Sequence, residues 1–219
     1  MSGTSAAAPP RNRLARAARD PAALSLAVTV SLFIAMALSG GFAYQGFFAP
    51  QVFLNLLIDN AFLCIVAVGM TFVILSGGID LSVGSVIALT TMVSASLVEK
   101  HGWSPGAVLP LVLLMGTGFG ALQGVLIQRF RLQPFIVTLA GMFLARGLCY
   151  LISIDSVSIT NPFYTEVSQL RVPLWEGAEL SVSAIIALAV VVLAVFVAHY
   201  TQFGRTVYAI GGNEHSAVL

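Results

Sequence analysis

Long apolar runs, separated by short polar links, make up most of the chain after an arginine-rich start. A membrane-spanning helix needs about 20 mostly apolar residues. Runs of that kind predict six spans, at residues 22–39, 52–75, 81–98, 107–128, 133–153 and 181–199. The pattern therefore predicts an all-α, polytopic membrane helix bundle, with the transmembrane domain at residues 22–199.

The composition supports a membrane protein. Hydrophobic residues make up 58% of the 219 residues and charged residues only 9%, whereas a soluble domain carries about 25% charged residues. A compact soluble fold of this length cannot hide so much apolar surface. Ten basic against nine acidic residues leave a net charge of +1, so no nucleic-acid footprint is present.

The N-terminal residues 1–21 differ from the rest, being rich in Ala, Ser, Pro and Arg. This composition predicts a disordered, solvated tail. A signal peptide with a cleavage site near Ala35, or an organellar presequence, would also explain an arginine-rich start. The further spans downstream favour a first anchor helix over either alternative.

Arginines indicate the orientation, because cytoplasmic loops are enriched in Lys and Arg. If the N-terminal tail is cytoplasmic, alternation places three links inside: residues 76–80, 129–132 and 200–219. The inner links then hold Arg129, Arg131 and Arg205, while most acidic residues of the links fall outside. We therefore predict six spans with both ends of this chain in the cytoplasm.

The stretch "VILSGGIDLSVGSVIAL" places Gly77, Gly78 and Asp80 between two apolar runs. A Gly-Gly pair ends helices, and a carboxylate at a helix start accepts free N–H groups and meets the positive end of the dipole. We predict a sharp turn at the inner mouth, capped by Asp80. Contact with a transported solute, or a cytoplasmic gate, is the alternative role of Asp80.

Polar residues inside the spans need a partner or water. Asn55, Asp59 and Asn60 lie on neighbouring turns of the second span, and Arg146 lies in the fifth. We predict that they line a solute path; hydrogen bonding between helices, or an interfacial position, is the alternative for the first three. Arg146 either snorkels outward or pairs with Asp59.

The fourth span carries Gly116, Gly120 and Gly124 on one helical face, which predicts close helix packing. The same letters superficially resemble a nucleotide-binding glycine loop, but no strand context surrounds them. The sequence also lacks a metal-ligand cluster, a nucleophile elbow, a P-loop and paired carboxylates. We predict no metal, no cofactor and no enzymatic activity in this chain.

Three separated motifs carry a family resemblance. "DNAFLCIVAVGMTFVILSGGIDLSVGSVIAL", "FIVTLAGMFLARGLCYL" and "FGRTVYAIGGNEHSAVL" resemble the permease subunits of bacterial ABC importers for ribose-type monosaccharides. Within that family the chain is most similar to the galactofuranose-type permease. The resemblance begins near residue 25. It implies passage of a sugar across the inner membrane by alternating access, powered by ATP that a separate subunit binds.

The resemblance also implies partners. They are a second permease subunit, identical or different, an ATP-binding subunit on the cytoplasmic side, a periplasmic sugar-binding protein, the sugar and membrane lipid. It implies that residues 200–219 form a cytoplasmic coupling loop, in which Gly204 and the pair Gly211-Gly212 bracket a short helix. The implied coupling residues are Gly204, Arg205, Ala209, Ile210, Gly211 and Asn213. The alternative is an ordinary loop whose arginine only sets topology.

Family members have about ten spans, so the chain resembles the N-terminal two-thirds of a permease and we expect a truncation. Two rival functions follow from the residues. One is a proton- or ion-coupled carrier that uses Asp59, Asp80 and Arg146 as a relay. The other is a remnant or assembly subunit that does not transport.

Overall fold

The computed structural model describes residues 21–175 and 177–212. All but one residue of the predicted N-terminal tail, and the last seven residues of the predicted coupling loop, lie outside these ranges. The chain divides into two compact units, residues 1–53 and residues 54–219, each with its own internal contacts.

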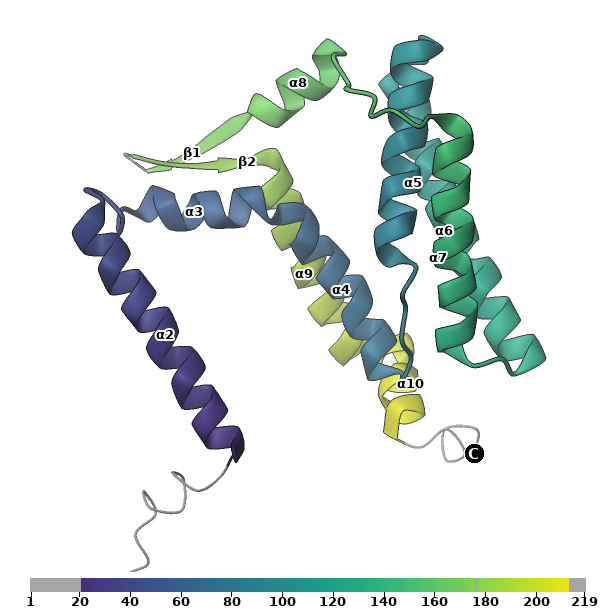
Figure 1. The fold of residues 1–219 in the computed structure, drawn as a ribbon, viewed down its shortest axis with the longest axis horizontal. Helices are drawn as coiled ribbons and strands as arrows, with labels where there is room; N and C mark the ends of the chain where they lie inside the picture. The colour runs from purple at the N-terminus through teal and green to yellow at the C-terminus, as the bar shows by residue number, and fades with distance from the viewer. Residues whose placement is uncertain (1–20, 176, 213–219) are drawn as a thin grey trace, which may run out of the picture. The chain divides into compact units, whose positions relative to one another are not determined.

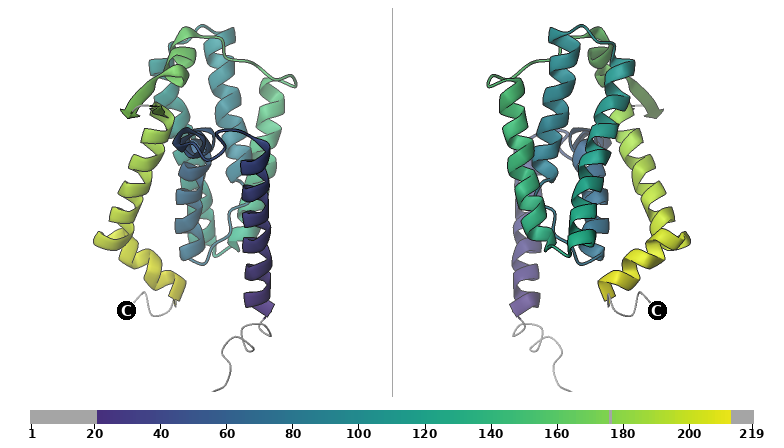
Figure 2. Two further views of the ribbon diagram at one scale, coloured as in Figure 1. Left: turned by 90° about the vertical axis from the view of Figure 1, so that its left-hand side faces the viewer. Right: turned by 90° about the vertical axis from the view of Figure 1, so that its right-hand side faces the viewer.

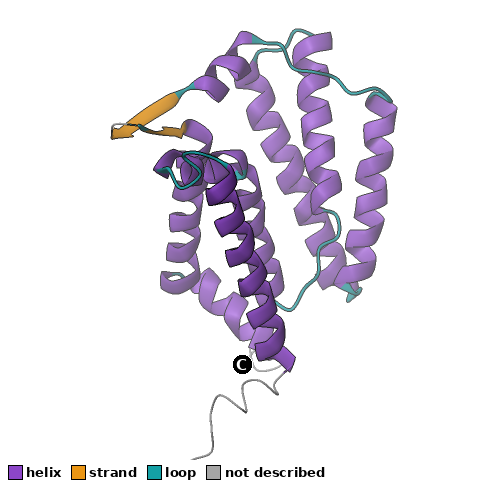
Figure 3. Ribbon diagram, turned by 60° about the vertical axis from the view of Figure 1, so that its left-hand side comes forward, coloured by secondary structure: helices purple, strands orange, loops and turns teal. Residues whose placement is uncertain are grey.

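The prediction of an all-α membrane bundle is confirmed. Five helices are each long and apolar enough to cross a membrane, and a bent pair of helices makes a sixth candidate. Strand is confined, in the described residues, to one small hairpin (Figure 3). The helices are α2 (Pro21–Ala43), α3 (Pro50–Asp59), α4 (Ala61–Leu75), α5 (Val83–Ala95), the π-helix η1 (Ser96–Lys100), α6 (Pro105–Phe130), α7 (Pro134–Ile152), α8 (Pro162–Gln169), α9 (Val182–Tyr200) and α10 (Gln202–Gly212), and the strands are β1 (Arg171–Trp175) and β2 (Ala178–Ser181).

In the first unit, the turn after α2 folds back onto the last turns of that helix. A Cβ atom on Gly40 would come within 2.7 Å of the Phe47 ring, and one on Gly41 would meet the Phe48 ring. The two phenylalanine rings are themselves packed edge to face, with centroids 5.2 Å apart. The paired glycines therefore leave the space that both rings occupy.

The second predicted span is not one continuous helix, which corrects the prediction for residues 52–75. It breaks into α3 and α4, which meet at an angle of 59°. Asn60 is the junction, and its side-chain Nδ2 donates a hydrogen bond to the Leu56 carbonyl at 2.8 Å. A side chain that bonds to nearby backbone is a common cause of a sharp kink.

The kink lets small residues of two helices meet. Ala61, directly after Asn60, is 2% exposed and packs with Ala184 and Ala187 of α9. Helix backbones approach closely where both faces carry small residues. The break therefore positions α4 against α9, and leucines of α3 cover the same cluster.

The other helices of this unit form a second group, in which α5, α6 and α7 pack on one another. The lower end of α4, the α6–α7 turn and α10 lie at one end of the unit, while α8 and the hairpin lie at the opposite end (Figure 1). The three links predicted to face the cytoplasm thus start from the same end. Which side of a membrane that end faces stays a prediction.

The predicted close packing of the glycine stripe on α6 is not seen among the described residues, since only Gly116 lies near another helix and its contact is an ordinary one. A Cβ on Gly116 would lie 3.9 Å from Thr90 of α5, whereas one on Gly120 or Gly124 would meet no described atom within 4 Å. Most large apolar side chains of the helices are also exposed. Those surfaces suit lipid or other protein helices.

A carboxylate clamp at the hairpin end fixes the loop that follows α7. Glu99 of η1 accepts hydrogen bonds from the Thr160 N–H at 2.6 Å, the Thr160 hydroxyl at 2.8 Å and the Asn161 N–H at 3.0 Å. Asn161 in turn caps α8 by accepting from the Phe163 N–H at 3.0 Å. The clamp therefore ties the start of α8 to the end of α5 and η1.

Replacing Glu99 with Ala should free this loop, because three hydrogen bonds to one carboxylate are lost together. We expect the amides of residues 154–161 to exchange with deuterium several-fold faster than in the wild type. Glu166→Ala is the matched control, since this α8 carboxylate is exposed and makes no hydrogen bond within the described residues. Equal exchange in the two variants would contradict the clamp.

Candidate functional site

The α4 helix ends in a glycine-dependent stop. Gly77 has a φ of +78°, its N–H donates to the Ile74 carbonyl at 2.9 Å, and the Gly78 N–H donates to the Val73 carbonyl at 2.9 Å. These two bonds form a Schellman motif, which satisfies the last carbonyls of a helix. The glycines therefore end the helix as their sequence suggested.

The chain then continues as an extended segment, residues 76–82, that lies alongside the bundle before α5 begins (Figure 1). The Ile79 carbonyl accepts a hydrogen bond from the Thr138 hydroxyl of α7 at 3.2 Å. Three residues further on, the Ser82 hydroxyl accepts from Gln123 Nε2 of α6 at 3.0 Å.

These contacts give the depth of the segment. Gln123 lies seven residues before the end of α6 at Phe130, which is about 10 Å at 1.5 Å per residue. The start of α5 is therefore inside the bundle, about 10 Å from the α6–α7 end. The helix stop at Gly77 and Gly78 is therefore followed by a connection that enters the bundle before α5 begins, and the place of this stop at the inner mouth stays a prediction.

Asp80 does not occupy the N-cap position that we predicted. The N-cap of α5 is Ser82. The Asp80 Oδ1 atom accepts from both the N–H and the hydroxyl of Ser82, each at 2.7 Å. The predicted contact is nevertheless present, because the Asp80 carboxylate accepts the Ser82 N–H at the start of α5 from two positions before it.

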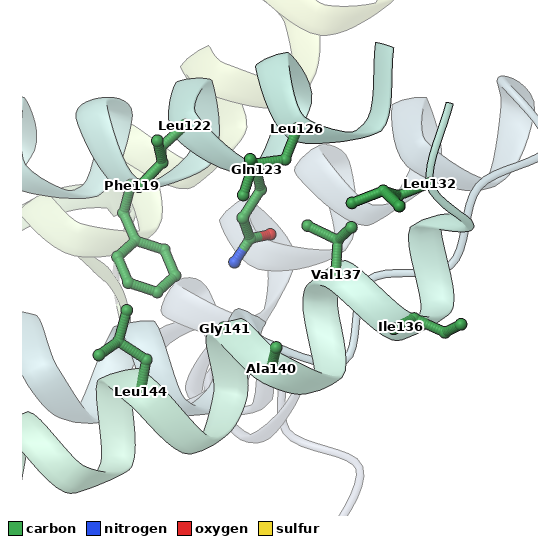
Figure 4. A pocket seen from close by; sticks show the side chains of 10 residues that line it. All are labelled: Phe119, Leu122, Gln123, Leu126, Leu132, Ile136, Val137, Ala140, Gly141 and Leu144. Atoms are coloured by element: carbon green, nitrogen blue, oxygen red, sulfur yellow. The ribbon is translucent and has the colours of Figure 1, made fainter. Parts of the chain in front are cut away.

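Asp80, Ser82, Gln123 and Thr138 form what we name the inner polar cluster. Three members are at most 8% exposed: Ser82, Gln123 and Thr138. Their side chains therefore form hydrogen bonds with protein groups and not with bulk water. Gly141 of α7 provides the space, since a Cβ there would clash with the Gln123 amide. Figure 4 shows the Gln123 side chain directed across to Gly141.

The cavity shown in Figure 4 lies between α6 and α7, next to the contact of Gln123 with Gly141. It measures about 370 Å³ and is lined almost wholly by apolar side chains, with Gln123 as its one amide. An apolar surface of this kind suits a lipid chain or another helix. A hydrophilic solute would lose its hydrogen bonds to water there.

The predicted path residues do not form one site. Asn55 and Asp59 share a face of α3, four residues apart, and Asn60 lies at the kink. Arg146 lies on α7 and lines a separate groove. Within the described residues no ion pair joins Asp59 to Arg146, and no hydrogen bond links either to Asp80.

The predicted coupling loop is a helix over most of its described length. α10 folds back sharply beneath α9 (Figure 2). The predicted bracketing glycines lie at the two ends of this helix: Gly204 is the third residue of α10, and Gly211 and Gly212 are its last two. A Cβ on Gly204 would clash with the Ala198 carbonyl, and one on Gly211 with the Leu75 carbonyl at the end of α4.

Both glycines therefore serve close backbone approach. Three of the predicted coupling residues, Arg205, Ala209 and Ile210, are exposed on α10. Asn213 lies outside the described residues.

Sequence reasoning missed Gln123, Thr138 and Ser82. An available signal was Gln123 itself, because an amide within a 26-residue apolar helix needs a partner. The other two hydroxyl residues gave no such signal, since serine and threonine often bond to their own helix.

Comparison with known proteins now identifies the family. Residues 52–219 match the family described as branched-chain amino acid transport system, permease component, and the chain belongs to that family. The resemblance to ribose-type permeases is also confirmed by individual relatives.

The chain is 50% identical to the inner membrane ABC transporter permease protein YjfF of Escherichia coli, over 90% of this chain and 59% of the relative. It is 41% identical to the fructose import permease protein FruG of Bifidobacterium longum, over 87% of this chain and 57% of the relative. It is 40% identical to the ribose import permease protein RbsC of Haemophilus influenzae, over 79% of this chain and 53% of the relative.

The chain thus spans a little more than half the length of these relatives. No solved structure matches it. Galactofuranose is not in the names of these three relatives, and stays a prediction.

Replacing Gln123 with Leu should loosen the segment at residues 76–82, because Ser82 loses its partner on α6. One such hydrogen bond contributes about 1 kcal/mol, which corresponds to a fall in melting temperature of about 2–4 °C for a chain of this size. The measurement is thermal unfolding in mild detergent.

Gln128→Leu is the control, since it makes the same change at an exposed position of α6. Gly141→Ala should reproduce the effect of Gln123→Leu by displacing the amide. If Gln123→Leu and Gln128→Leu have the same melting temperature, the inner polar cluster does not hold the segment at residues 76–82.

Proposed function

We propose that the chain is the membrane-spanning part of a permease subunit in an ATP-driven monosaccharide importer of the bacterial inner membrane. Family membership and the sugars in the relatives' names support this function. The structural observation that carries it is α10, which packs against the ends of α4 and α9 and exposes Arg205. An exposed helix in this position suits docking by a separate ATP-binding subunit.

Transport requires no covalent chemistry from this chain. The sequence has no P-loop, so ATP binding and hydrolysis belong to the partner subunit. A periplasmic sugar-binding protein would deliver the sugar, and a second permease subunit would complete the path. The chain would then alternate between outward-open and inward-open forms, with its N-terminal tail in the cytoplasm.

The contact between α10 and α4 gives the ATPase a route to the membrane segment. Gly211 lies against the Leu75 carbonyl, and Leu75 is the last residue before the segment at residues 76–82. The Phe203 ring of α10 also packs against the Phe72 ring of α4 in a tilted arrangement, with ring centroids 5.6 Å apart. A displacement of α10 would therefore act on the end of α4 and on Gly77, Gly78 and Asp80 beyond it.

Galactofuranose is the particular sugar that we propose, on the likeness of the motifs to galactofuranose-type permeases. Asn55, Asp59, Asn60 and Arg146 are the proposed path residues. The carrier hypothesis receives no support, since a relay needs connected groups, and Asp59, Asp80 and Arg146 are not linked by hydrogen bonds in the described part of the chain.

Arg205→Glu should weaken association with the ATP-binding subunit, because the docking face of α10 would carry the opposite charge. We expect normal membrane insertion and a loss of co-purifying ATPase. Gly211→Ala should act differently, by pushing α10 away from Leu75, and should lower sugar-stimulated ATP hydrolysis.

Arg129→Glu is the charge-matched control at the same end of the bundle, on the last turn of α6. Unchanged co-purification in the Arg205 variant, together with unchanged sugar-stimulated ATP hydrolysis in the Gly211 variant, would refute the coupling role of α10.

Asp59→Ala should lower sugar uptake if its carboxylate contacts the sugar. A lost hydrogen bond to a charged group is worth about 1.5–3 kcal/mol, or about tenfold or more in rate. Uptake of labelled sugar by cells or vesicles is the measurement. Asp155→Ala is the control, as an exposed carboxylate in the loop after α7, and wild-type uptake in the Asp59 variant would remove it from the path.

A further inference from the structure

A second groove lies between α5 and α7 and differs from the apolar cavity in its lining. It measures about 210 Å³, and four of its lining residues carry hydrogen-bonding side chains: Ser85, Arg146, Tyr150 and Ser153. Pockets for drug-sized ligands measure about 300–1,000 Å³. The smaller volume fits one sugar ring.

The hydroxyl groups of this groove are available, unlike most hydroxyls on the spans. Thr71, Ser94 and Thr117 each donate to the carbonyl four residues earlier in their own helix, at 2.7–2.8 Å. Within the described residues, the side chains of Ser85, Tyr150 and Ser153 make no hydrogen bond. These three hydroxyls therefore keep their donors and acceptors for a ligand.

Arg146 adds a cation that has no counter-ion among the described residues. It lies six residues before the end of α7 at Ile152, about 9 Å from that end at 1.5 Å per residue. It makes no ion pair within the described part of the chain, and no carboxylate lines the groove. A cation at this depth usually faces a water-filled path or a ligand.

The groove also adjoins the break in the membrane segment. Ser85 is one helical turn beyond Ser82, the N-cap of α5 and a member of the inner polar cluster. Residues three apart on a helix are neighbours. A solute that leaves the groove toward the α5 N-terminus therefore next meets Ser82 and Asp80.

We propose that this groove binds a neutral monosaccharide during passage, through hydroxyl groups on adjacent ring carbons. Each protein hydroxyl donates one hydrogen bond and accepts up to two, and the guanidinium donates up to five. Sugar hydroxyls need donors and acceptors together, which matches this set. The inference rests on the proposed function and adds Ser85, Tyr150 and Ser153 to the path.

An anionic lipid headgroup could also satisfy Arg146. It would use the guanidinium but leave the hydroxyl acceptors unmatched, because a phosphate offers mainly acceptor oxygens. Three of the four polar groups are neutral hydroxyls, so the sugar is the better fit. The experiment separates the two ligands.

The assembled transporter, with its ATP-binding subunit and sugar-binding protein, would be reconstituted in vesicles with labelled D-galactose, which supplies the proposed furanose form, or with labelled D-ribose, D-fructose or D-allose. Tyr150→Phe and Ser153→Ala should each lower the kcat/KM ratio of sugar import by about twofold to tenfold, as expected for one lost hydrogen bond. Ser94→Ala is the control, since its hydroxyl bonds to its own helix. Ratios equal to wild type in both groove variants would overturn the proposal.

The wild-type chain offers a direct readout without substitution. Cys149 lines the groove, whereas Cys64 packs against the cluster between α4 and α9. Saturating sugar should slow modification of Cys149 by a small thiol reagent several-fold and leave Cys64 unchanged. Equal rates at Cys149 with and without an imported sugar would also overturn the proposal.

Vesicle composition distinguishes the lipid. If Arg146→Gln lowers import in phosphatidylglycerol vesicles but equals wild type in phosphatidylcholine vesicles, the groove binds a lipid headgroup and the sugar proposal is wrong. A lower ratio in both lipids supports it. Absence of ATP-dependent uptake of any tested sugar by the wild-type complex would instead overturn the proposed function, and this inference with it.

Discussion

Peptide groups that leave a helix inside a membrane must find hydrogen bonds in the protein, because lipid offers none. The segment at residues 76–82 meets this constraint with partners from three helices. Its first N–H groups bond back to α4, the Ile79 carbonyl accepts from Thr138 of α7, and Ser82 pairs with Gln123 of α6. These bonds hold the start of α5 against α6 and α7, since the segment that precedes α5 is bonded to both of those helices.

The same constraint explains the spacing of small residues. Gly141 has no side chain because the Gln123 amide occupies that space, and Gly211 has none because the end of α4 lies against it. The first contact joins α7 to α6, and the second joins the backbone of α10 to the end of α4, from which the segment at residues 76–82 begins. A force applied to α10 would therefore act on a short stretch of chain that is held at both ends.

Polar side chains in the bundle fall into two kinds. Most hydroxyls, and the amide of Asn60, bond to backbone one turn away, which satisfies them and in one case kinks the helix. A smaller set, on the groove between α5 and α7, has no partner in the described residues. The two kinds of hydroxyl have similar sequence surroundings. Only the folded chain distinguishes them, by whether the hydroxyl forms a hydrogen bond with a carbonyl of its own helix.

The sequence by itself determined the class of protein, because apolar runs of about 20 residues form membrane-spanning helices and few other structures. It also determined the helix stop at Gly77, since the left-handed backbone of a Schellman motif is a local requirement that glycine meets. The depth of the break was decided only by tertiary structure. A Gly-Gly pair ends a helix at any depth, and the partners that hold the segment, Gln123 and Thr138, lie 41 and 59 residues from the groups they bond.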